Sequence, residues 1–522
     1  MRPPFWHPPV ELSAVEETII KRIRRARLFT FLRLRRHELF DDTFQTELAA
    51  TYADSPQGQP PIPPAQLALA TLLQAYTGVS DDEVIEATVM DRRWQLVLDC
   101  LDCETPPFSK GTLVGFRQRL IAHQLDRRLI ERTVDLAGQR KEFGTQQLRV
   151  ALDSSPLWGA GRVEDTYNLL GHALRKALSV IARQQGRGLA QVAQEAQASL
   201  VSAPSLKAAL DLDWDDPVSQ TRALTQVLAA LNAAEAWIAQ QSLPQQVADV
   251  VATSVEAALQ VRSQDVTTNA TGQITLRDGV AKDRRISLVD REMRHGRKSK
   301  SHLINGYKRH VLRDLDSDVV RAVGLTPANA PEASVTKALA EDLAAQAITL
   351  RELHIDRAYL SSHWVQERSD GLTIYCKAWP VHGGRYYPKT TFCWNWDAQL
   401  LRCPAGHDLP FEPGGQVHFP AELCAVCLLR MQCTSSPRGR TVAVHADEKL
   451  LQELRERQLT PLGRAQLRER VAVEHDLAHI GHWQGARARY IGLRKNLFDL
   501  RRCAVINNLH VIARSGCLPL AA

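Results

Sequence analysis

Three carboxylates lie far apart in the sequence, and each stands in a setting that could bring it to a shared site. Asp153 ends the apolar run Leu148–Leu152, and Asp356 ends the shorter run Leu353–Ile355. Glu474 lies in a long helical pattern near the C-terminus. Two acids at strand ends and one on a helix can converge on two divalent ions about 3.5–4 Å apart, which activate an attacking oxygen and stabilise a leaving oxygen across a phosphate. The pattern therefore indicates the cutting and joining of phosphodiesters.

The expected ions follow from the charge of these acids. Two carboxylates a few ångströms apart stay ionised when a cation lies between them. Mg²⁺ prefers oxygen ligands, so we expect Mg²⁺, or Mn²⁺ in its place, at the three acids. An aspartate at a strand end is also a common turn residue, and a glutamate four residues after Arg470 is also how a surface ion pair looks. The competing acids are Asp165 for the first position, and Glu469 and Asp476 for the third.

A second cluster with metal-ligand spacing consists of Cys393, Cys403, His407, Cys424, Cys427 and Cys433. Cys424 and Cys427 have the two-residue gap of a zinc knuckle, in which both thiolates reach one tetrahedral ion. Cys403 and Cys433 would complete a structural Zn²⁺ site, and His407 or Cys393 could replace one of them. The alternative is a set of reduced cysteines that pack without metal.

Composition limits the broad class of the protein. The chain has 522 residues, of which 44% are hydrophobic, enough for roughly three or four domains. Its net charge of +7 is clustered, which suits a polyanionic partner as well as plain solubility. The sequence has no run of about 18 apolar residues and no signal-peptide pattern at its start, so we expect no membrane span and a cytoplasmic location.

The elements that must position the acids can be read along the chain. A hairpin over 306–312 and 319–323, a helix over 334–347 and strands before Asp356 and at 372–376 predict an α/β fold with a mixed sheet flanked by helices. If the strands before Asp153 and Asp356 are neighbours, their carboxylates lie side by side. A later helix that carries Glu474 can then cross that edge.

The N-terminal part reads as all-helical. Ser80 and Glu83 form a capping box. Ser109 can cap a further helix that carries Arg117 and Arg119. Capped helices joined by tight turns are typical of a helix-turn-helix DNA reader, and equally of an ordinary helical bundle. The expected segments are a helical DNA-binding domain (1–145), the first part of the core (146–173), an all-helical insertion (174–270), the second part of the core (271–390), a small zinc-ribbon-like insert (391–440) and the C-terminal part of the core (441–515).

Several long motifs resemble one family. The chain is similar to the bacterial insertion-sequence DDE transposases, in particular the group with a helical N-terminal domain and a Cys-rich insert late in the catalytic domain. The resemblance rests on the stretches 153–161, 163–171, 326–329, 356–359, 473–479 and 485–496. It implies an RNase H-like catalytic core in which Asp153, Asp356 and Glu474 bind metal, and an N-terminal domain that binds terminal inverted repeats.

The resemblance also indicates where DNA is gripped. Some related transposases have Tyr, Arg, Glu and Lys at fixed spacing around the third acid. Here Arg470 and Glu474 match, but Leu467 and Gly481 stand where the Tyr and Lys would be. The residues expected to contact DNA are Arg117, Arg119, Arg297, Lys298, Arg470, Arg487, Arg489, Arg494 and Lys495.

The function that these observations predict is DNA transposition. The partners would be double-stranded DNA at the element ends and at the target, bound by a homo-oligomer in the cytoplasm and at the nucleoid. The alternatives are a catalytically inactive DNA-binding regulator derived from a transposase, and a DNA nuclease without strand transfer. Metal-dependent cleavage separates the first alternative from a transposase, and analysis of the products separates the second.

Overall fold

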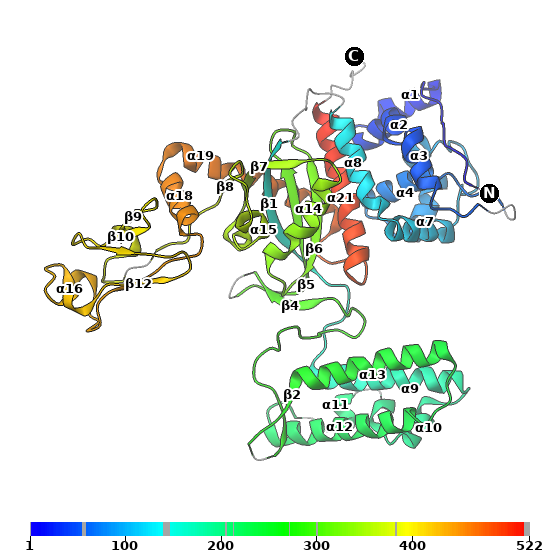
Figure 1. The fold of residues 1–522 in the computed structure, drawn as a ribbon. Helices are drawn as coiled ribbons and strands as arrows, with labels where there is room; N and C mark the ends of the chain where they lie inside the picture. The colour runs from blue at the N-terminus through cyan, green and yellow to red at the C-terminus, as the bar shows by residue number, and fades with distance from the viewer. Residues whose placement is uncertain are drawn as a thin grey trace.

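The protein has a central sheet with helices packed around it and two projecting parts (Figure 1). The computed structural model describes residues 2–54, 59–138, 147–203, 206–211, 213–270, 272–298, 301–381 and 384–515. The expected boundary at 145/146 lies outside these residues. No helix within the described ranges is long and apolar enough to cross a membrane.

The central sheet is mixed, as expected, and its longest path runs β4-β5-β1-β7-β8, with β6 also paired to β5. β1 lies antiparallel to β5 and parallel to β7, and β7 lies parallel to β8. β5 and β6 form the predicted hairpin. The strands are β1 (Gln147–Trp158), β4 (Arg294–Arg297), β5 (Leu303–Asp314), β6 (Val320–Pro327), β7 (Thr349–His354) and β8 (Thr373–Tyr375).

Short helices cover one face of this sheet. Leu339 and Leu343 of α14 pack with Leu152 and Leu353 in an apolar core between helix and sheet. This core removes the apolar faces of β1 and β7 from water and fixes the strand ends that lead to the site. The elements are η2 (Glu332–Val335), α14 (Thr336–Ala344), η3 (Arg357–Tyr359) and α15 (His363–Gln366).

The N-terminal helices share one hydrophobic core with the C-terminal helices and the sheet. Phe29 and Leu69 belong to the same buried cluster as Val311, Phe498 and Leu509, and α21 lies between the N-terminal helices and the sheet in Figure 1. These helices are α1 (Ala14–Arg22), α2 (Arg27–Leu39), α3 (Asp42–Ala49), α4 (Pro64–Thr77), α5 (Asp81–Met90), α6 (Arg92–Leu98), α7 (Lys110–Ala122) and α8 (Leu125–Gly138).

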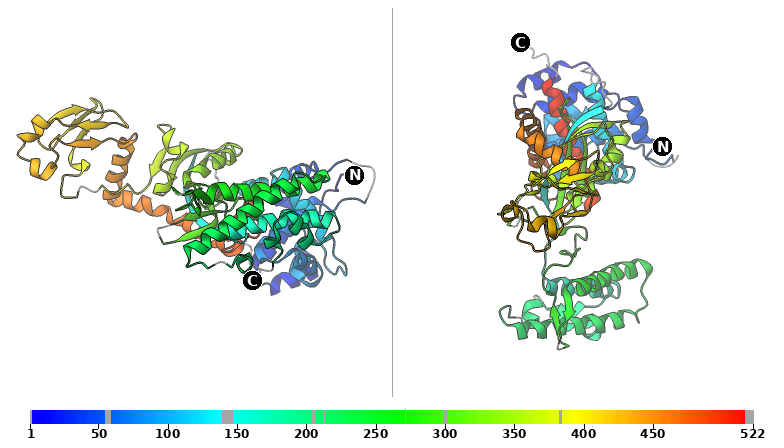
Figure 2. Two further views of the ribbon diagram at one scale, coloured as in Figure 1. Left: turned by 90° about the horizontal axis from the view of Figure 1, so that it is seen from below. Right: turned by 60° about the vertical axis from the view of Figure 1, so that its left-hand side comes forward.

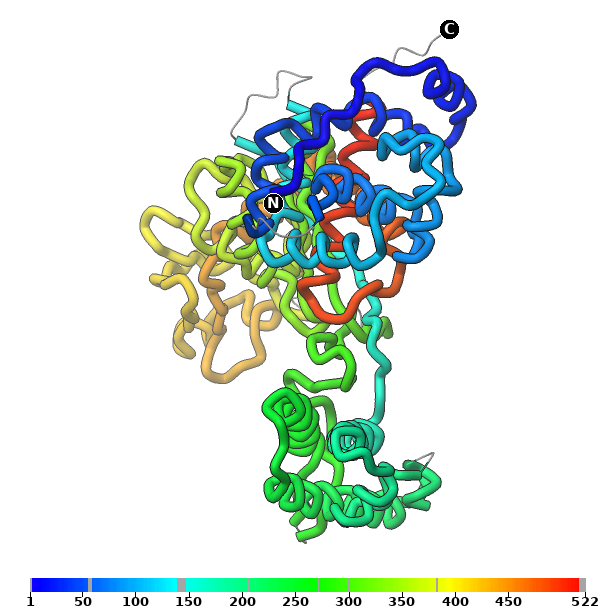
Figure 3. Tube along the Cα trace, turned by 90° about the vertical axis from the view of Figure 1, so that its right-hand side faces the viewer, coloured from blue at the N-terminus to red at the C-terminus, as the bar shows by residue number. Residues whose placement is uncertain are grey.

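The helical insertion projects from the sheet and contains its own core (Figures 1 and 3). It begins at Thr166, earlier than the expected 174, because Asp165 caps its first helix by accepting a hydrogen bond from Asn168 N. The insertion contains α9 (Thr166–Gln184), α10 (Leu189–Glu195), η1 (Ser199–Ser202), α11 (Leu206–Leu210), α12 (Pro217–Ile238), α13 (Gln245–Asp265), β2 (Val266–Thr268) and β3 (Ile274–Leu276).

The Cys-rich insert lies at the far end of the molecule from the N-terminal helices (Figures 1 and 2). Its small core is formed around Phe392, Leu401 and Phe419. It contains η4 (Lys389–Thr391), β9 (Cys393–Asn395), β10 (Leu400–Arg402), β11 (Asp408–Pro410), β12 (Gln416–His418), α16 (Ala421–Ala425), α17 (Arg430–Cys433) and β13 (Thr441–Ala443). The chain returns through α18 (Glu448–Leu459), α19 (Pro461–Glu469), α20 (Val471–Gln484) and α21 (Leu493–Ser515).

Candidate active site and cysteine cluster

Asp153 lies on β1, and Asp356 follows the end of β7, the neighbouring parallel strand. The last paired residues of the β1–β7 ladder are Ala151 and His354. Continuing that register by two residues places Asp153 opposite Asp356. The sequence suggested that Asp153 ends its strand. This was wrong, because β1 continues to Trp158 along β5. The strand that stops is β7, after which Asp356 caps η3 by accepting a hydrogen bond from Ala358 N at 2.8 Å.

Glu474 reaches the same place from α20, and Arg470 joins it to Asp153. The Arg470 guanidinium donates to Asp153 Oδ2 and, at 2.8 Å, to Glu474 Oε1. The helix is held there because Val473, Leu477 and Ile480 are buried in the core shared with β1 and β5. Glu474 lies one turn along, and its side chain is 47% exposed. Acids 321 residues apart in the sequence therefore share one cation.

The other two acids and Arg470 act on the carboxyl of Asp153. Burial raises the pKa of the Asp153 carboxyl, and the charges of Asp356 and Glu474 raise it further. Arg470 and the hydrogen bond from Ser154 N lower it. A carboxylate in this setting gains from any cation that approaches it.

The donor set fits a hard divalent ion. All three side chains offer carboxylate oxygens, which Mg²⁺ and Mn²⁺ prefer, and Asp153 and Glu474 already bind a positive charge at Arg470. Among the described residues, no three acid, histidine or cysteine side chains are placed to hold a metal ion as they stand. The Arg470 guanidinium thus lies where a cation shared by Asp153 and Glu474 would lie.

The competing acids have other partners. Asp165 caps α9, Glu469 pairs with Arg149, and Asp476 accepts hydrogen bonds from Arg313 and Asn507. Burial raises the pKa of Asp476, and Arg313 lowers it. Each of these acids therefore has partners other than Arg470, the cation that Asp153 and Glu474 share.

Two protein-family models match the chain on either side of this sheet. The model described as a transposase domain (DUF772) matches residues 22–119. The model described as a transposase DDE domain matches residues 402–513, which include Glu474. These two matches support an insertion-sequence DDE transposase. No curated protein and no solved structure matches it.

The matched domains indicate the general class of reaction. A DDE domain is that of a polynucleotidyl transferase, and a transposase acts on DNA. The two matched segments leave out Asp153 and Asp356. The β1–β7 register brings these two acids together, and Arg470 joins Asp153 to Glu474.

Three of the arginines expected to contact DNA make contacts within the fold. Arg117 pairs with Asp81 at 2.5 and 2.6 Å. Arg489 donates to the Val79 carbonyl, and Arg494 pairs with Asp126 at 2.6 Å. Each of these contacts ties one N-terminal helix or loop to another part of the fold. A DNA contact by these three residues stays a prediction.

The other predicted contacts vary in exposure. Arg297, Lys298 and Lys495 are exposed. Arg487 donates to the Gly159 and Ala160 carbonyls, next to a bridge between its own backbone and Trp158. Arg119 lies over the ring of Tyr52 at 4.4 Å. None of these five residues lines the groove that contains Asp356 and Glu474.

A groove beside the acids contains cations that sequence reasoning missed. It is lined by Asp356 and Glu474 and by Arg357, Lys377, Arg464, Arg468, Arg470 and Leu467. Leu467 therefore does line the site, although it replaces the Tyr of related transposases. The other missed residues come from three separate elements, and the signal in the sequence was limited to the i,i+4 spacing of Arg464 and Arg468 on one helix.

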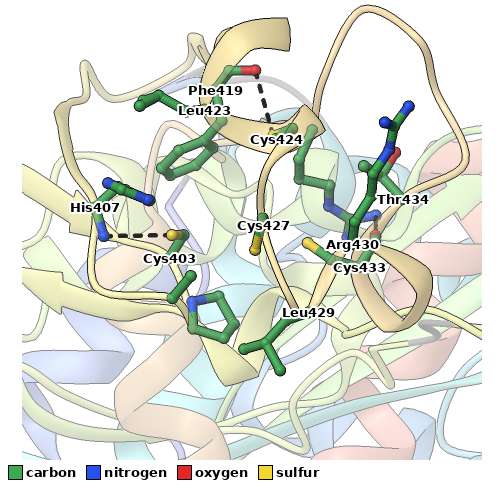
Figure 4. Close-up of a pocket in the computed structure, with 13 residues that line it drawn as sticks. Cys403, His407, Phe419, Leu423, Cys424, Cys427, Leu429, Arg430, Cys433 and Thr434 are labelled. Carbon is green, nitrogen blue, oxygen red and sulfur yellow. Dashed lines mark hydrogen bonds between the residues drawn. The ribbon is translucent and has the colours of Figure 1, made fainter.

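The predicted cysteines meet around one cavity (Figure 4). It is lined by Cys403, Cys424, Cys427 and Cys433 together with His407, and Cys393 is absent from the lining. The backbone N–H of His407 donates to Cys403 Sγ at 3.4 Å. Burial raises the pKa of the Cys433 thiol, as do the three other cysteines, and Arg440 lowers it. Four soft donors around one cavity fit Zn²⁺ in chemistry, although the thiols are not placed as a ready ligand set.

Proposed function

We propose that the protein binds the terminal inverted repeats of an insertion sequence and catalyses metal-dependent strand cleavage and strand transfer. The observation that carries the proposal is the meeting of Asp153, Asp356 and Glu474 at one sheet edge, with two of them joined by Arg470. Mg²⁺ or Mn²⁺ held by these acids would neutralise charge on the phosphate and make water or a 3′-hydroxyl a better nucleophile.

The side chains of the protein would position the reacting groups and neutralise charge on the phosphate. In the first step a water oxygen bonds to phosphorus, the bond from phosphorus to the 3′-oxygen breaks, and the 3′-hydroxyl is released. In the second step that hydroxyl attacks a target phosphate and displaces the target's 3′-oxygen. Asp153 and Asp356 are fixed by the β1–β7 register, which would hold the reacting groups in line. Arg470 is placed to turn from the acids to a phosphate oxygen.

The wider assignments follow from the same arrangement. The strand order, in which β5 alone runs against β6, β1, β7 and β8, supports an RNase H-like core. We propose that the N-terminal helices read the element ends and that a homo-oligomer assembles on the DNA. The bacterial element would be bound in the cytoplasm, at the nucleoid.

The test is cleavage of the element's own ends by Asp153→Asn beside Asp165→Asn. Both changes remove one carboxylate charge, but Asn at position 165 can still cap α9. We expect Asp153→Asn to lose cleavage with Mg²⁺ and Mn²⁺ and to keep DNA binding in a gel-shift assay, while Asp165→Asn keeps both. Full cleavage by Asp153→Asn would overturn the assignment of the site.

Two further outcomes decide between the alternatives. Specific DNA binding by the wild type without cleavage in any divalent ion would favour an inactive regulator. Cleavage without joining of a labelled 3′ end to a second DNA would favour a nuclease. Joined products that carry the labelled 3′ end support the transposase.

We also propose that the Cys-rich insert binds a structural Zn²⁺ through Cys403, Cys424, Cys427 and Cys433. The insert has a small core, and small modules usually need a staple. The test compares the zinc content of Cys427→Ser and Cys393→Ser. We expect about one zinc per wild-type chain, loss in Cys427→Ser and retention in Cys393→Ser, because Cys393 does not line the cavity. Zinc-free wild-type protein purified without chelator would refute the site.

A further inference from the structure

We propose that the groove beside the acids holds the sugar–phosphate backbone of the DNA strand next to the attacked phosphate. Arg464 and Arg468 of α19 would contact it from one wall, and Arg357 and Lys377 from the other. The inference rests on the proposed function, because it gives the groove a strand whose neighbouring phosphate is at the acids.

These four cations have no carboxylate partner among the described residues, and three of them are exposed. Arg464 and Arg468 are exposed on α19, and Lys377 is exposed after β8. Arg357 donates to the Lys377 carbonyl at 3.2 Å, and Arg464 donates to the Leu459 carbonyl at 2.7 Å. Within the part of the chain that the structure describes, none of the four has a carboxylate partner in an ion pair.

Arginines elsewhere around the sheet behave differently. Arg149 pairs with Asp316 and Glu352, Arg321 with Asp314, and Arg368 with Asp447. Each of these three arginines is matched to at least one acid, whereas the four groove cations are not. A set of unmatched cations gathered along one groove leaves an excess of positive charge that a polyanion can neutralise.

Two of the three acids lie within the same groove. Asp356 and Glu474 line it together with the cations. A phosphate that enters unaided would be repelled by these carboxylates. A strand whose neighbouring phosphates bind Arg464 and Arg468 brings its next phosphate to the acids through the covalent backbone, so binding at the cations offsets that repulsion.

The spacing of Arg464 and Arg468 along α19 suits a strand of phosphates. Arg464 and Arg468 are four residues apart on one helix, so their Cβ atoms lie about 5–6 Å apart. This separation is close to that of successive phosphates along a strand. Leu459 and Val471, which also line the groove and are exposed, offer apolar surface to the sugars between those phosphates. A small anion would use one cation and leave the row of the others unexplained.

The experiment compares two double variants of the full-length protein. Arg464→Gln with Arg468→Gln removes two charges from the groove. Lys176→Gln with Arg183→Gln removes two charges from exposed positions of α9 in the helical insertion. The probe is a fluorescent mixed-sequence duplex, and binding is measured by anisotropy over a salt series. Each lost phosphate contact lowers the slope of log K against log salt by about 0.7–0.9.

We expect the groove variant to bind more weakly, with a slope lower by about 1.4–1.8 for two contacts. We expect the α9 variant to match the wild type. An unchanged slope in a folded groove variant, with the fold checked by circular dichroism, would overturn the proposal. Lys377→Gln tests the opposite wall, and we expect it to lower the slope by about 0.7–0.9.

A chemical cycle then places the strand. Once the cleaved phosphate is mapped, neutral methylphosphonates replace the phosphates beside it. We expect them to weaken binding by the wild type at least several-fold more than binding by the groove variant, since the variant has already lost those contacts. Equal weakening in both proteins would overturn the placement. A wild-type protein that never cleaves DNA would contradict the proposed function. The salt series would still test whether the groove binds DNA.

Discussion

Arg117 shows how burial changes the role of a single arginine. Its side chain is 9% exposed and its guanidinium donates twice to Asp81, which is 23% exposed. Hydrogen bonding from Arg117 is the main cause that lowers the pKa of the Asp81 carboxyl to about 2. The pair joins the start of α5 to α7, so at this position a charge that looks available in the sequence is already used within the fold.

We expect Asp81→Asn to lower the free energy of unfolding by roughly 1–3 kcal/mol at pH 7, less than for a fully buried pair because Asp81 is partly exposed. Because the folded pKa is depressed below the unfolded value of about 3.9, the pair stabilises the fold above that value. The difference between wild type and variant should therefore shrink as pH falls from about 4 to about 2.

Denaturant unfolding at several pH values measures this difference. Asp82→Asn is the matched control. The carboxylate of Asp82 neighbours Asp81 in the sequence, is 77% exposed and pairs with Lys110 at the surface. We expect the control to change stability by less than about 1 kcal/mol. An equal loss in both variants would mean that the Asp81–Arg117 pair contributes nothing beyond surface charge.

Arg470 occupies the position between two acids that a metal ion would share. In Arg470→Gln, Asp153 and Glu474 lose the cation that they share, so a divalent ion no longer displaces a guanidinium when it binds. We expect Mn²⁺ to raise the melting temperature of the variant by more than that of the wild type; binding at 100 times Kd is worth about 2.7 kcal/mol. Arg468→Gln, which contacts neither acid, should respond to Mn²⁺ as the wild type does. A smaller Mn²⁺ response in Arg470→Gln than in the wild type would contradict this.

At the scale of elements, the register of β1 against β5 positions Asp153, and Gly306 permits that register. Gly306 has φ +152°, and a Cβ there would lie 2.3 Å from Gly159 N and 2.4 Å from the Leu157 carbonyl oxygen. These are backbone atoms, so a methyl group can be accommodated only if the strands separate.

We expect Gly306→Ala to destabilise the protein by about 2–4 kcal/mol, as strained or overpacked positions do, and to lose most of its cleavage activity. Gly371→Ala is the control, because a Cβ there meets nothing within 4 Å. Thermal unfolding and the cleavage assay provide both readouts. Normal stability in Gly306→Ala would show that the β1–β5 contact is looser than these distances indicate.

The elements also show how far the sequence could predict this fold. The capping box at Ser80, the hairpin of β5 and β6, and the strand before Asp356 are local patterns, and the structure contains each of them. The extension of β1 beyond Asp153 could not be read, because Ser154, Ser155 and Pro156 are poor strand formers that β5 pairs nevertheless. The groove cations were missed because tertiary folding alone brings α19, η3 and β8 together.

At the scale of the whole molecule, the two helical parts are attached to the sheet in different ways. The N-terminal helices share their core with α20, α21 and the sheet. The insertion has cores composed of its own helices, with Val266, Ile274, Leu276 and Leu288 packed against one of them. Removing the N-terminal helices would expose the buried apolar face of α21, whereas removing the insertion would leave the sheet covered.

The chain also leaves and re-enters the catalytic part at one point. Thr166 Oγ1, at the start of the insertion, donates to Asp265 Oδ2 at 2.8 Å, and Arg277 N donates to the Asp265 carbonyl at 2.8 Å. The two ends of the insertion are thus neighbours. A short flexible linker can join residues 165 and 278 without straining the sheet, because closing a short loop costs little.

We expect a variant in which a Gly/Ser linker replaces residues 166–277 to fold cooperatively and to retain metal-dependent cleavage. A variant that lacks residues 2–138 should aggregate or unfold, because Phe498, Leu500 and Leu509 of α21 lose the helices that cover them. Size-exclusion chromatography and thermal unfolding compare the two, and the cleavage assay reads the active site of the first. If both truncations gave folded protein, the shared core would not be needed for the fold. If the insertion variant folded but never cut DNA, the insertion would have to take part in binding the substrate.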